Sequence, residues 1–508
     1  MQGRPKIIPL PLLAILIMFG IFLYFSWFVS SPVRAAKIDS FILYNTDEVF
    51  RFYLVRLSLQ SVFVFVNSYV RPIYMIIAAI FYNLLSAGML SLRLMNVLFS
   101  CASLYIIWKL LNKIGIKDSV STLAILGIAT NPIYFLNSIS VQAVNMFCFF
   151  LVTATYLFYC KKYLLSVIAT SLLPLIRPEG YLSLFILPIF LLKENRQNIK
   201  YAILLFLPLI VWGLANVLLL GDGLLSRLFY QSLLASHNVF GKFPLGQTLS
   251  MRPTFTITPL EFLLSSGYPV FLLFLIGFGI KLFDKRYSFI SVSFLAYFFF
   301  YSAMTIVVNL GFEKINVHGI MALVSTPIVP FLVLFAVIPA TILERCKSTG
   351  RFVVVLFTAI FILSNLIQIT AFRQDPALRW RAIFNLKEEN VLKDTAKWLG
   401  EYAKENDTER LYISVDEATH KFTNIFLIYL PPGIKFYMLS VEDKNISLID
   451  LETIKVLPFR REGSVYLSRN KGLTDLGGQI KCKLIKGFGD ISLYFYALEK
   501  AGDIQPGI

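Results

Sequence analysis

Charged residues are scarce in this chain. They make up 15% of its 508 residues, against 57% hydrophobic residues. Soluble domains carry about a quarter charged residues, so this composition indicates a polytopic membrane protein. The charges are also unbalanced, with 47 lysines and arginines against 30 acids. In a membrane protein, basic cytoplasmic loops and attraction to anionic lipid explain that excess, and we expect no nucleic acid partner.

Cysteine and histidine are equally sparse. The five cysteines include no CxxC pair, so the sequence indicates neither a disulfide scaffold nor a zinc site. The three histidines, His237, His318 and His420, lie too far apart in sequence to assign a metal site. No Walker, GxGxxG, GxSxG or HExxH element stands in a usable context. This argues against an ATP-driven pump and against a hydrolase of the usual kind.

Long apolar runs are what the chain has instead, and a membrane-spanning helix needs ~20 such residues. The first run, 7–29, is too long for the apolar core of a signal peptide, so we expect an uncleaved first helix. A later run, 72–90, is ambiguous. The other candidate spans are 94–111, 119–136, 140–159, 163–176, 180–192, 201–220, 267–283, 287–309, 319–343 and 352–371.

The distribution of lysines and arginines among the loops indicates whether 72–90 spans the membrane. If it does not, five basic loops fall on the same side as the N-terminus, as the positive-inside rule requires. We therefore predict that 72–90 is an interfacial or re-entrant helix. The chain is then a multi-pass cell-membrane protein of about eleven spans with a cytoplasmic N-terminus. The five loops contain Lys109/Lys113/Lys117, Lys161/Lys162, Lys193/Arg196/Lys200, Lys281/Lys285/Arg286 and Arg345/Lys347/Arg351.

This topology places several polar segments on the outer, extracytoplasmic side. The first of them is the loop 30–93. Within it, residues 47–66 carry their apolar residues on one face, which predicts a helix lying along the membrane surface. The other outer segments are 177–180, 221–266 and 311–319. The tail from 372 onward lies on the same side, and we expect polar residues of the four outer segments to converge on one cavity.

The tail differs from the rest of the chain. An amphipathic helix is predicted at 386–406, followed by four strands, and this alternation is typical of a small α/β domain. We therefore predict an α-helical transmembrane domain at 1–371 and a soluble outer domain at 372–508. The predicted strands cover 411–415, 434–439, 464–467 and 493–497.

An acidic pair, Asp47-Glu48, follows the first span. At the membrane surface a carboxylate can act as a general base toward an acceptor hydroxyl, or can hold a metal near a phosphate leaving group. An alternative role is equally favoured by the residues alone. Asn45 or Thr46 can cap a helix here, and acids in its first turn are stabilised by the helix dipole.

Basic residues in the outer segments are candidate ligands for a lipid phosphate. Arg71 can bind a phosphate or simply extend to the interface. Arg177 can do the same, with Glu179 holding it in place, or the two can form a local ion pair in a plain turn. The long and short outer loops add four further candidates, which can also be surface residues or interfacial anchors: His237, Lys242, Lys314 and His318.

The order of these motifs resembles the GT-C superfamily of polytopic glycosyltransferases that use lipid-phosphate sugars. That superfamily includes protein O-mannosyltransferases and the lipid A aminoarabinose transferases. The resemblance covers 1–371, and the chain departs from the family pattern at Val70-Arg71-Pro72 and Val317-His318. It rests on Asp47-Glu48, Arg71-Pro72-Ile73-Tyr74 continuing to Arg93-Leu94, Trp108 to Lys113, Asn131-Pro132, Arg177-Pro178-Glu179-Gly180 and the late helix from His318 to Phe335.

The resemblance implies an inverting transfer from a polyprenyl or dolichyl phosphate sugar to a lipid, glycan or protein acceptor on the outer face. Asp47 and Glu48 would be the catalytic carboxylates, and Asp47 would act as the base. The donor-binding residues would be Arg71, Tyr74, Arg177, Glu179, His237, Lys242, Lys314 and His318. No cofactor is required, although Mg²⁺ or Mn²⁺ is compatible with the acids.

Three other functions fit a membrane protein of this composition. A transporter or flippase of lipid-linked sugars would show internal repeats and broken helices, and no repeat between the halves is evident. A membrane anchor that displays the tail would leave the polar outer residues without a role. A ligase-like or polymerase-like enzyme would use a lipid pyrophosphate donor instead.

Overall fold

The computed structural model describes residues 8–30, 46–66, 71–221, 267–311, 326–344, 350–374, 386–414 and most of 426–500. The chain forms two compact units. The first comprises 1–30, 71–214 and 245–379, and the second comprises 31–70, 215–244 and 380–508. Residues 31–70 thus belong with the C-terminal residues, so a catalytic domain ending at 371 remains a prediction.

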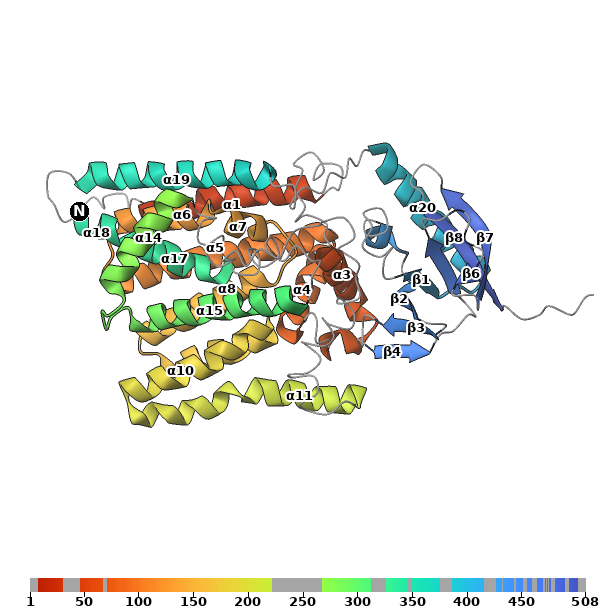
Figure 1. The fold of residues 1–508 in the computed structure, drawn as a ribbon, viewed down its shortest axis with the longest axis horizontal. Helices are drawn as coiled ribbons and strands as arrows, with labels where there is room; N and C mark the ends of the chain where they lie inside the picture. Colours follow the sequence, from red (N-terminus) through yellow and green to blue (C-terminus); the bar gives the residue numbers. More distant parts are fainter. Residues whose placement is uncertain are drawn as a thin grey trace, which may run out of the picture. The chain divides into compact units, whose positions relative to one another are not determined.

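The first unit is a bundle of apolar helices. α5 lies at its centre and packs against α1, α6 and α8, and α6 also packs against α19 (Figure 1). The helices are α1 (Leu10–Val29), α4 (Pro72–Leu85), α5 (Met89–Lys113), α6 (Asp118–Ala129), α7 (Pro132–Ser138), α8 (Val144–Tyr159), α9 (Tyr163–Leu172), α10 (Tyr181–Glu194), α11 (Leu207–Leu220), α14 (Tyr268–Lys281), α15 (Ser288–Gly311), α17 (Val329–Ala336), α18 (Ile338–Leu343) and α19 (Gly350–Gln374). Single 3₁₀ segments are η3 (Leu173–Leu175), η4 (Pro178–Gly180), η5 (Arg196–Leu205) and η8 (Thr326–Ile328).

Several of these helices can cross a membrane. In the described part of the chain, four meet the length and hydropathy requirement, and the bent pair α6–α7 adds a fifth if it counts as one span. The four are Leu10–Val29, Met89–Lys113, Arg196–Leu220 and Thr326–Leu343. The protein is therefore a polytopic membrane protein. The count of about eleven spans and the interfacial placement of 72–90 remain predictions.

Lipid contact explains the outward face of α11. Leu207, Ile210, Val211 and Leu214 are between 48% and 59% exposed. An apolar row of this kind costs free energy in water, at about 25 cal/mol for each Å² left exposed, but not in hydrocarbon. The opposite side of the same helix carries Trp212, which is buried in the bundle.

The Asn131-Pro132 stretch bends the α6–α7 pair by 70°. The Asn131 side chain accepts hydrogen bonds from the amides of Ile133 and Tyr134, at 3.1 and 3.2 Å, and so caps α7. On the other side of the break, Asn365 Nδ2 donates to Gly127 O at 3.1 Å and to Thr130 Oγ1 at 2.8 Å. Side-chain amides thus compensate for the interrupted helix, as a membrane interior requires.

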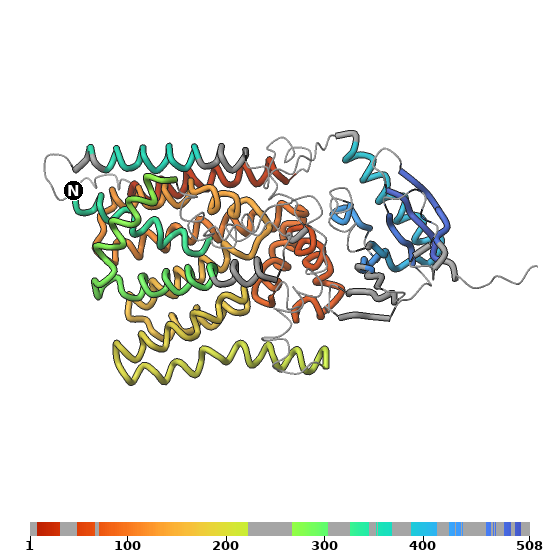
Figure 2. Tube along the Cα trace, viewed as in Figure 1, coloured from red at the N-terminus to blue at the C-terminus, as the bar shows by residue number. Residues whose placement is uncertain are grey.

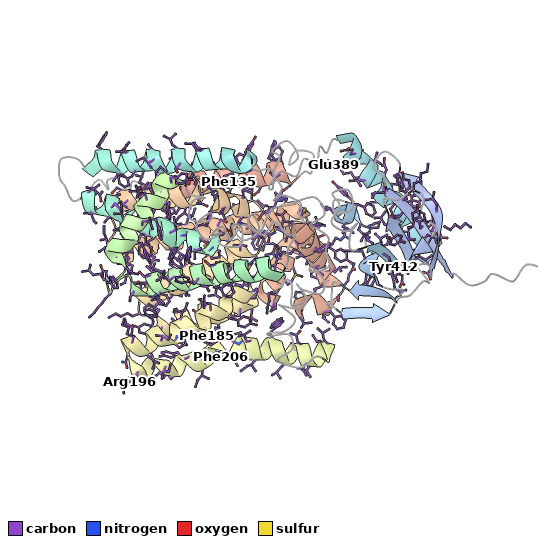
Figure 3. The ribbon with its side chains drawn as sticks, in the orientation of Figure 1. Phe135, Phe185, Arg196, Phe206, Glu389 and Tyr412 are labelled. Carbon is purple, nitrogen blue, oxygen red and sulfur yellow. The ribbon has the colours of Figure 1, made fainter. Side chains whose placement is uncertain are left out.

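The bend is also held by aromatic packing. Phe135 of α7 lies against two rings of α1, with centroids 5.5 Å from Phe22 and 5.3 Å from Phe25 (Figure 3). The segment between α7 and α8 is bonded to α5. Asn96 of α5 donates to the backbone oxygens of Ser140 and Gln142, at 2.6 and 2.9 Å. The irregular backbone between α7 and α8 is therefore fixed from α5.

The second unit contains an eight-stranded sheet in the order β4-β3-β2-β1-β5-β8-β7-β6. β1 runs parallel to β2 and β5, and the other pairs are antiparallel. α20 (Leu386–Glu405) packs on one face, where the Trp398 and Phe495 rings lie 5.0 Å apart. Tyr412, labelled in Figure 3, lies in a buried tyrosine cluster with Tyr466 and Tyr496. The strands are β1 (Arg410–Ser414), β2 (Lys435–Glu442), β3 (Asn445–Asp450), β4 (Lys455–Pro458), β5 (Ser464–Ser468), β6 (Asp475–Leu476), β7 (Ile480–Phe488) and β8 (Leu493–Lys500).

The predicted small α/β fold of the tail is confirmed, and the four predicted strands are β1, β2, β5 and β8. The helix expected at 47–66 is shorter. It is α3 (Thr46–Arg56), followed by two 3₁₀ segments, η1 (Leu57–Leu59) and η2 (Val62–Val66). Its apolar side chains are packed within protein rather than laid on lipid, since those from Val49 to Val55 are at most 4% exposed. In the tube of Figure 2, α3 lies near the red end of the colour scale and α20 lies in its blue part.

Candidate functional site

Arg71 stands at the start of α4 in an unusual backbone conformation. Its φ and ψ are 59° and 140°, a region that residues with a side chain rarely occupy. Such a residue typically costs ~1–3 kcal/mol and persists where the surroundings fix it. Pro72, which follows at the first helical position, disfavours the helical region for Arg71. The backbone therefore directs this arginine into the bundle rather than along α4.

The Arg71 side chain is only 1% exposed and lies against two aromatic rings. Its guanidinium carbon is 5.0 Å from the centroid of Trp212 and 5.8 Å from that of Tyr181. Nη1 donates to Tyr181 Oη at 3.4 Å. Nε and Nη2 have no acceptor among the residues that the structure describes. Stacking on rings offsets part of the cost of burying the charge, at about 2 kcal/mol for a desolvated pair.

No carboxylate neutralises Arg71 within the described residues. A buried arginine with free donors and no counter-charge is complementary to an anion, above all to a planar or tetrahedral oxyanion that can accept two parallel hydrogen bonds. Tyr74, one turn along α4, is fully buried on the same helix.

Arg177 presents the contrasting case. Its Nε lies 2.9 and 3.2 Å from the two oxygens of Glu179, and its Nη2 lies 2.6 Å from Oε1. The two side chains are 12% and 7% exposed. This bidentate pair is the one that the sequence predicted for the turn. Because Glu179 already compensates its charge, Arg177 is less available to an anion than Arg71.

The Arg-Pro-Glu-Gly turn also places Tyr181. A side chain at Gly180 would overlap the backbone of Leu173 and Pro174, so η4 can pack onto η3 only with glycine there. α10 begins at the next residue, Tyr181, whose hydroxyl accepts the bond from Arg71. The structure therefore brings Arg71 together with two aromatic residues that the sequence did not single out, Tyr181 and Trp212. Tyr181 directly follows the turn that contains the Arg177–Glu179 pair.

Asp47 and Glu48 lie in the first turn of α3, in the second unit. Glu48 is fully buried. The side chain of Asp47 lies outside the described residues, as do His237, Lys242, Lys314 and His318. The convergence of these residues with Arg71 on one cavity therefore remains a prediction. Within the described ranges no group of three histidine, cysteine or acidic side chains could hold a metal ion.

Two solved structures share the fold over nearly the whole chain. ArnT from Cupriavidus metallidurans bound to undecaprenyl phosphate matches with a TM-score of 0.58 at 9% identity. The same protein in the apo state matches with a TM-score of 0.55 at 10% identity. Each alignment covers 95% of this chain and 97% of that protein.

A third similar structure is a longer protein, the Archaeoglobus fulgidus oligosaccharyltransferase in complex with Zn and sulfate. The TM-score is 0.48 at 14% identity, and the alignment covers 76% of this chain but 58% of that protein. No protein-family model matches the sequence, and the search of curated proteins returns no match.

Proposed function

From the GT-C fold of this chain, we propose that it is a membrane glycosyltransferase that moves a sugar from a polyprenyl or dolichyl phosphate to an acceptor hydroxyl. One observation in the site carries the proposal: the buried Arg71 guanidinium, whose Nε and Nη2 have no acceptor in the described part of the chain. The similar ArnT structure holds undecaprenyl phosphate, a ligand whose charge such an arginine would match.

In the proposed reaction, the acceptor oxygen attacks the anomeric carbon of the donor sugar. The bond between that carbon and the phosphate oxygen breaks, and polyprenyl phosphate leaves with the electron pair. Asp47 takes the hydroxyl proton, and attack opposite to the leaving group inverts the anomeric centre. Glu48 is fully buried, which favours Asp47 as the base.

Arg71 stabilises the leaving group as its negative charge develops. A fixed cation in a site of low polarity does this well, because it does not have to reorganise during the reaction. Tyr181 and Trp212 hold the guanidinium plane, and Arg177 with Glu179 holds the turn that carries Tyr181. Lys242, Lys314, His237 and His318 are further candidate donor ligands. The proposal does not require Mg²⁺ or Mn²⁺, although either could be held by Asp47 and Glu48.

The reaction is placed on the outer face of the cell membrane. The N-terminus is then cytoplasmic and the C-terminal sheet extracytoplasmic, as the five basic loops predict. The acceptor is a lipid, a glycan or a protein on that side.

Replacement of the base tests the proposal. Purified wild-type protein is given a panel of undecaprenyl-phosphate and dolichyl-phosphate monosaccharides with a membrane extract as acceptor, and release of polyprenyl phosphate is measured. Asp47→Asn should lower the rate by about 10²- to 10⁴-fold, the range for loss of a general base. Asp394→Asn, the same change at an exposed position of α20, should leave it unchanged. Full activity of the Asp47 variant would refute its role.

A flippase is the second candidate, because the α6–α7 pair is bent by 70° and broken helices are typical of transporters. Here the break is bonded to side chains of other helices, as with Asn365, which suits a fixed fold. The same panel separates the two functions: a flippase would move a labelled lipid across a vesicle membrane without releasing polyprenyl phosphate.

A further inference from the structure

The short helix that carries Asp47 packs against the C-terminal sheet. α3 lies between the first membrane helix and α4 in sequence, yet it belongs to the second unit. Its residues Phe50 and Tyr53 are each 1% exposed, and so is Phe436 of β2, on which they pack. This contact joins residues 383 positions apart in the chain.

The contact occurs beside the start of β2. β3 pairs with β2 from Met438 onward, and the described residues include no strand partner for Phe436 on this side. The Lys435 amide donates to Glu409 O next to β1, at 2.9 Å. Because successive amides of a strand point to opposite sides, the Phe436 amide points away from β1. A buried backbone amide that points out of its ladder needs another acceptor.

Tyr53 supplies that acceptor. Its hydroxyl oxygen accepts the hydrogen bond of the Phe436 amide at 3.0 Å. The two rings also touch, with centroids 4.8 Å apart, and Phe50 adds a second ring at 5.6 Å. At the end of α3, Arg56 Nη1 donates to Ile428 O at 3.3 Å. The C-terminal domain thus holds α3 by three residues on successive turns.

The attachment at Tyr53 also fixes the orientation of the first turn of α3. Tyr53 lies six residues after Asp47, which is about 9 Å along a helix axis, and a helix transmits orientation over that length. We propose that the C-terminal domain serves to position the first turn of α3, which carries Asp47, and that Tyr53 is its main positioning residue. This inference rests on the proposed function, in which Asp47 is the base.

The test compares two Tyr→Phe variants that each remove one hydroxyl from the same unit. Tyr53→Phe removes the bond to β2. Tyr429→Phe removes a bond of similar length, 2.9 Å from Tyr429 Oη to Glu389 Oε1, which joins α20 to another segment (Glu389 is labelled in Figure 3). For each, kcat, the KM for the donor, thermal stability and amide hydrogen exchange over residues 46–56 are measured.

Tyr53→Phe should lower kcat by roughly 3- to 10-fold, since a single buried hydrogen bond is lost. The KM for the donor should stay near the wild-type value, and exchange over 46–56 should become faster. Tyr429→Phe should leave kcat and the exchange of α3 unchanged. Phe436→Leu keeps the backbone bond but removes the ring contacts. It should also lower kcat and make exchange over 46–56 faster, as Tyr53→Phe does.

Three results would overturn the inference. The first is an equal loss of kcat in both tyrosine variants, and the second is an unchanged kcat in Tyr53→Phe together with faster exchange of α3. The third is unchanged exchange in Tyr53→Phe, which would show that the bond to β2 does not hold the helix. A wild-type protein that transfers no sugar from the panel would instead refute the proposed function, and the exchange result would still decide whether the sheet holds α3.

Discussion

The difference between the two arginines gives the most specific prediction. Arg71 is buried without a carboxylate partner in the described part of the chain, whereas Arg177 is bound by Glu179 through two nitrogens. Arg71→Lys keeps the positive charge but removes the planar fork and its stacking on Trp212. Binding of undecaprenyl phosphate to purified protein should therefore weaken, and this can be measured directly by titration in detergent.

The magnitude follows from what lysine cannot replace. It loses one charge-assisted hydrogen bond, ~1.5–3 kcal/mol, and part of the ring stacking, ~0.5–1 kcal/mol. At 1.4 kcal/mol for each factor of ten, the dissociation constant should rise by about 30-fold or more. Trp212→Leu, which removes one ring and leaves Arg71, should raise it by about 5- to 30-fold.

Arg177→Lys is the matched comparison. Loss of its bidentate pair should lower the unfolding temperature and change the affinity for undecaprenyl phosphate by less than about threefold, because Glu179 already compensates the charge. The reasoning would be refuted if Arg71→Lys bound like the wild type, or if Arg177→Lys showed the larger loss of affinity.

Three further predictions concern packing, pH and topology. Gly277→Ala should lower the free energy of unfolding by more than ~2 kcal/mol, because a methyl group there meets the backbone oxygen of Phe335, while Gly279→Ala, with open space around it, should not. The pKa of Asp284 is lowered by the hydrogen bond from Lys281, so the carboxylate stabilises the fold above the unfolded pKa of ~3.9 and loses this effect as pH falls through the folded pKa. The melting temperatures of wild type and Asp284→Asn should then converge in acid. A tag after residue 508 should be accessible from outside intact cells, and protection of that tag would refute the predicted topology.

The sequence predicted the elements that carry strong apolar patterns. The long apolar runs are helices in the structure. The four central strands of the C-terminal sheet were predicted because each carries buried side chains, such as Leu411 and Val465. The outer strands β3, β4, β6 and β7 were missed. Residues such as Lys481 and Lys483 make β7 polar, and a strand that gains its stability from pairing rather than burial gives little signal in composition.

The site was predicted in part. The Arg177–Glu179 pair could be anticipated because the two residues are adjacent in the turn and charges are rare nearby. Trp212 gave no signal, since a tryptophan in an apolar run is ordinary and its partner Arg71 is far away in sequence. The same reason hid the attachment of α3 to β2, where the amphipathic pattern fitted a lipid surface as well as a protein surface.

A structure of the protein with undecaprenyl phosphate tests the central claim most directly. We predict that the lipid phosphate lies within hydrogen-bond distance, ~2.7–3.0 Å, of Nε and Nη2 of Arg71, and that Asp47 faces the same cavity. A phosphate bound away from Arg71, or an Asp47 carboxylate turned away from that cavity, would contradict the account.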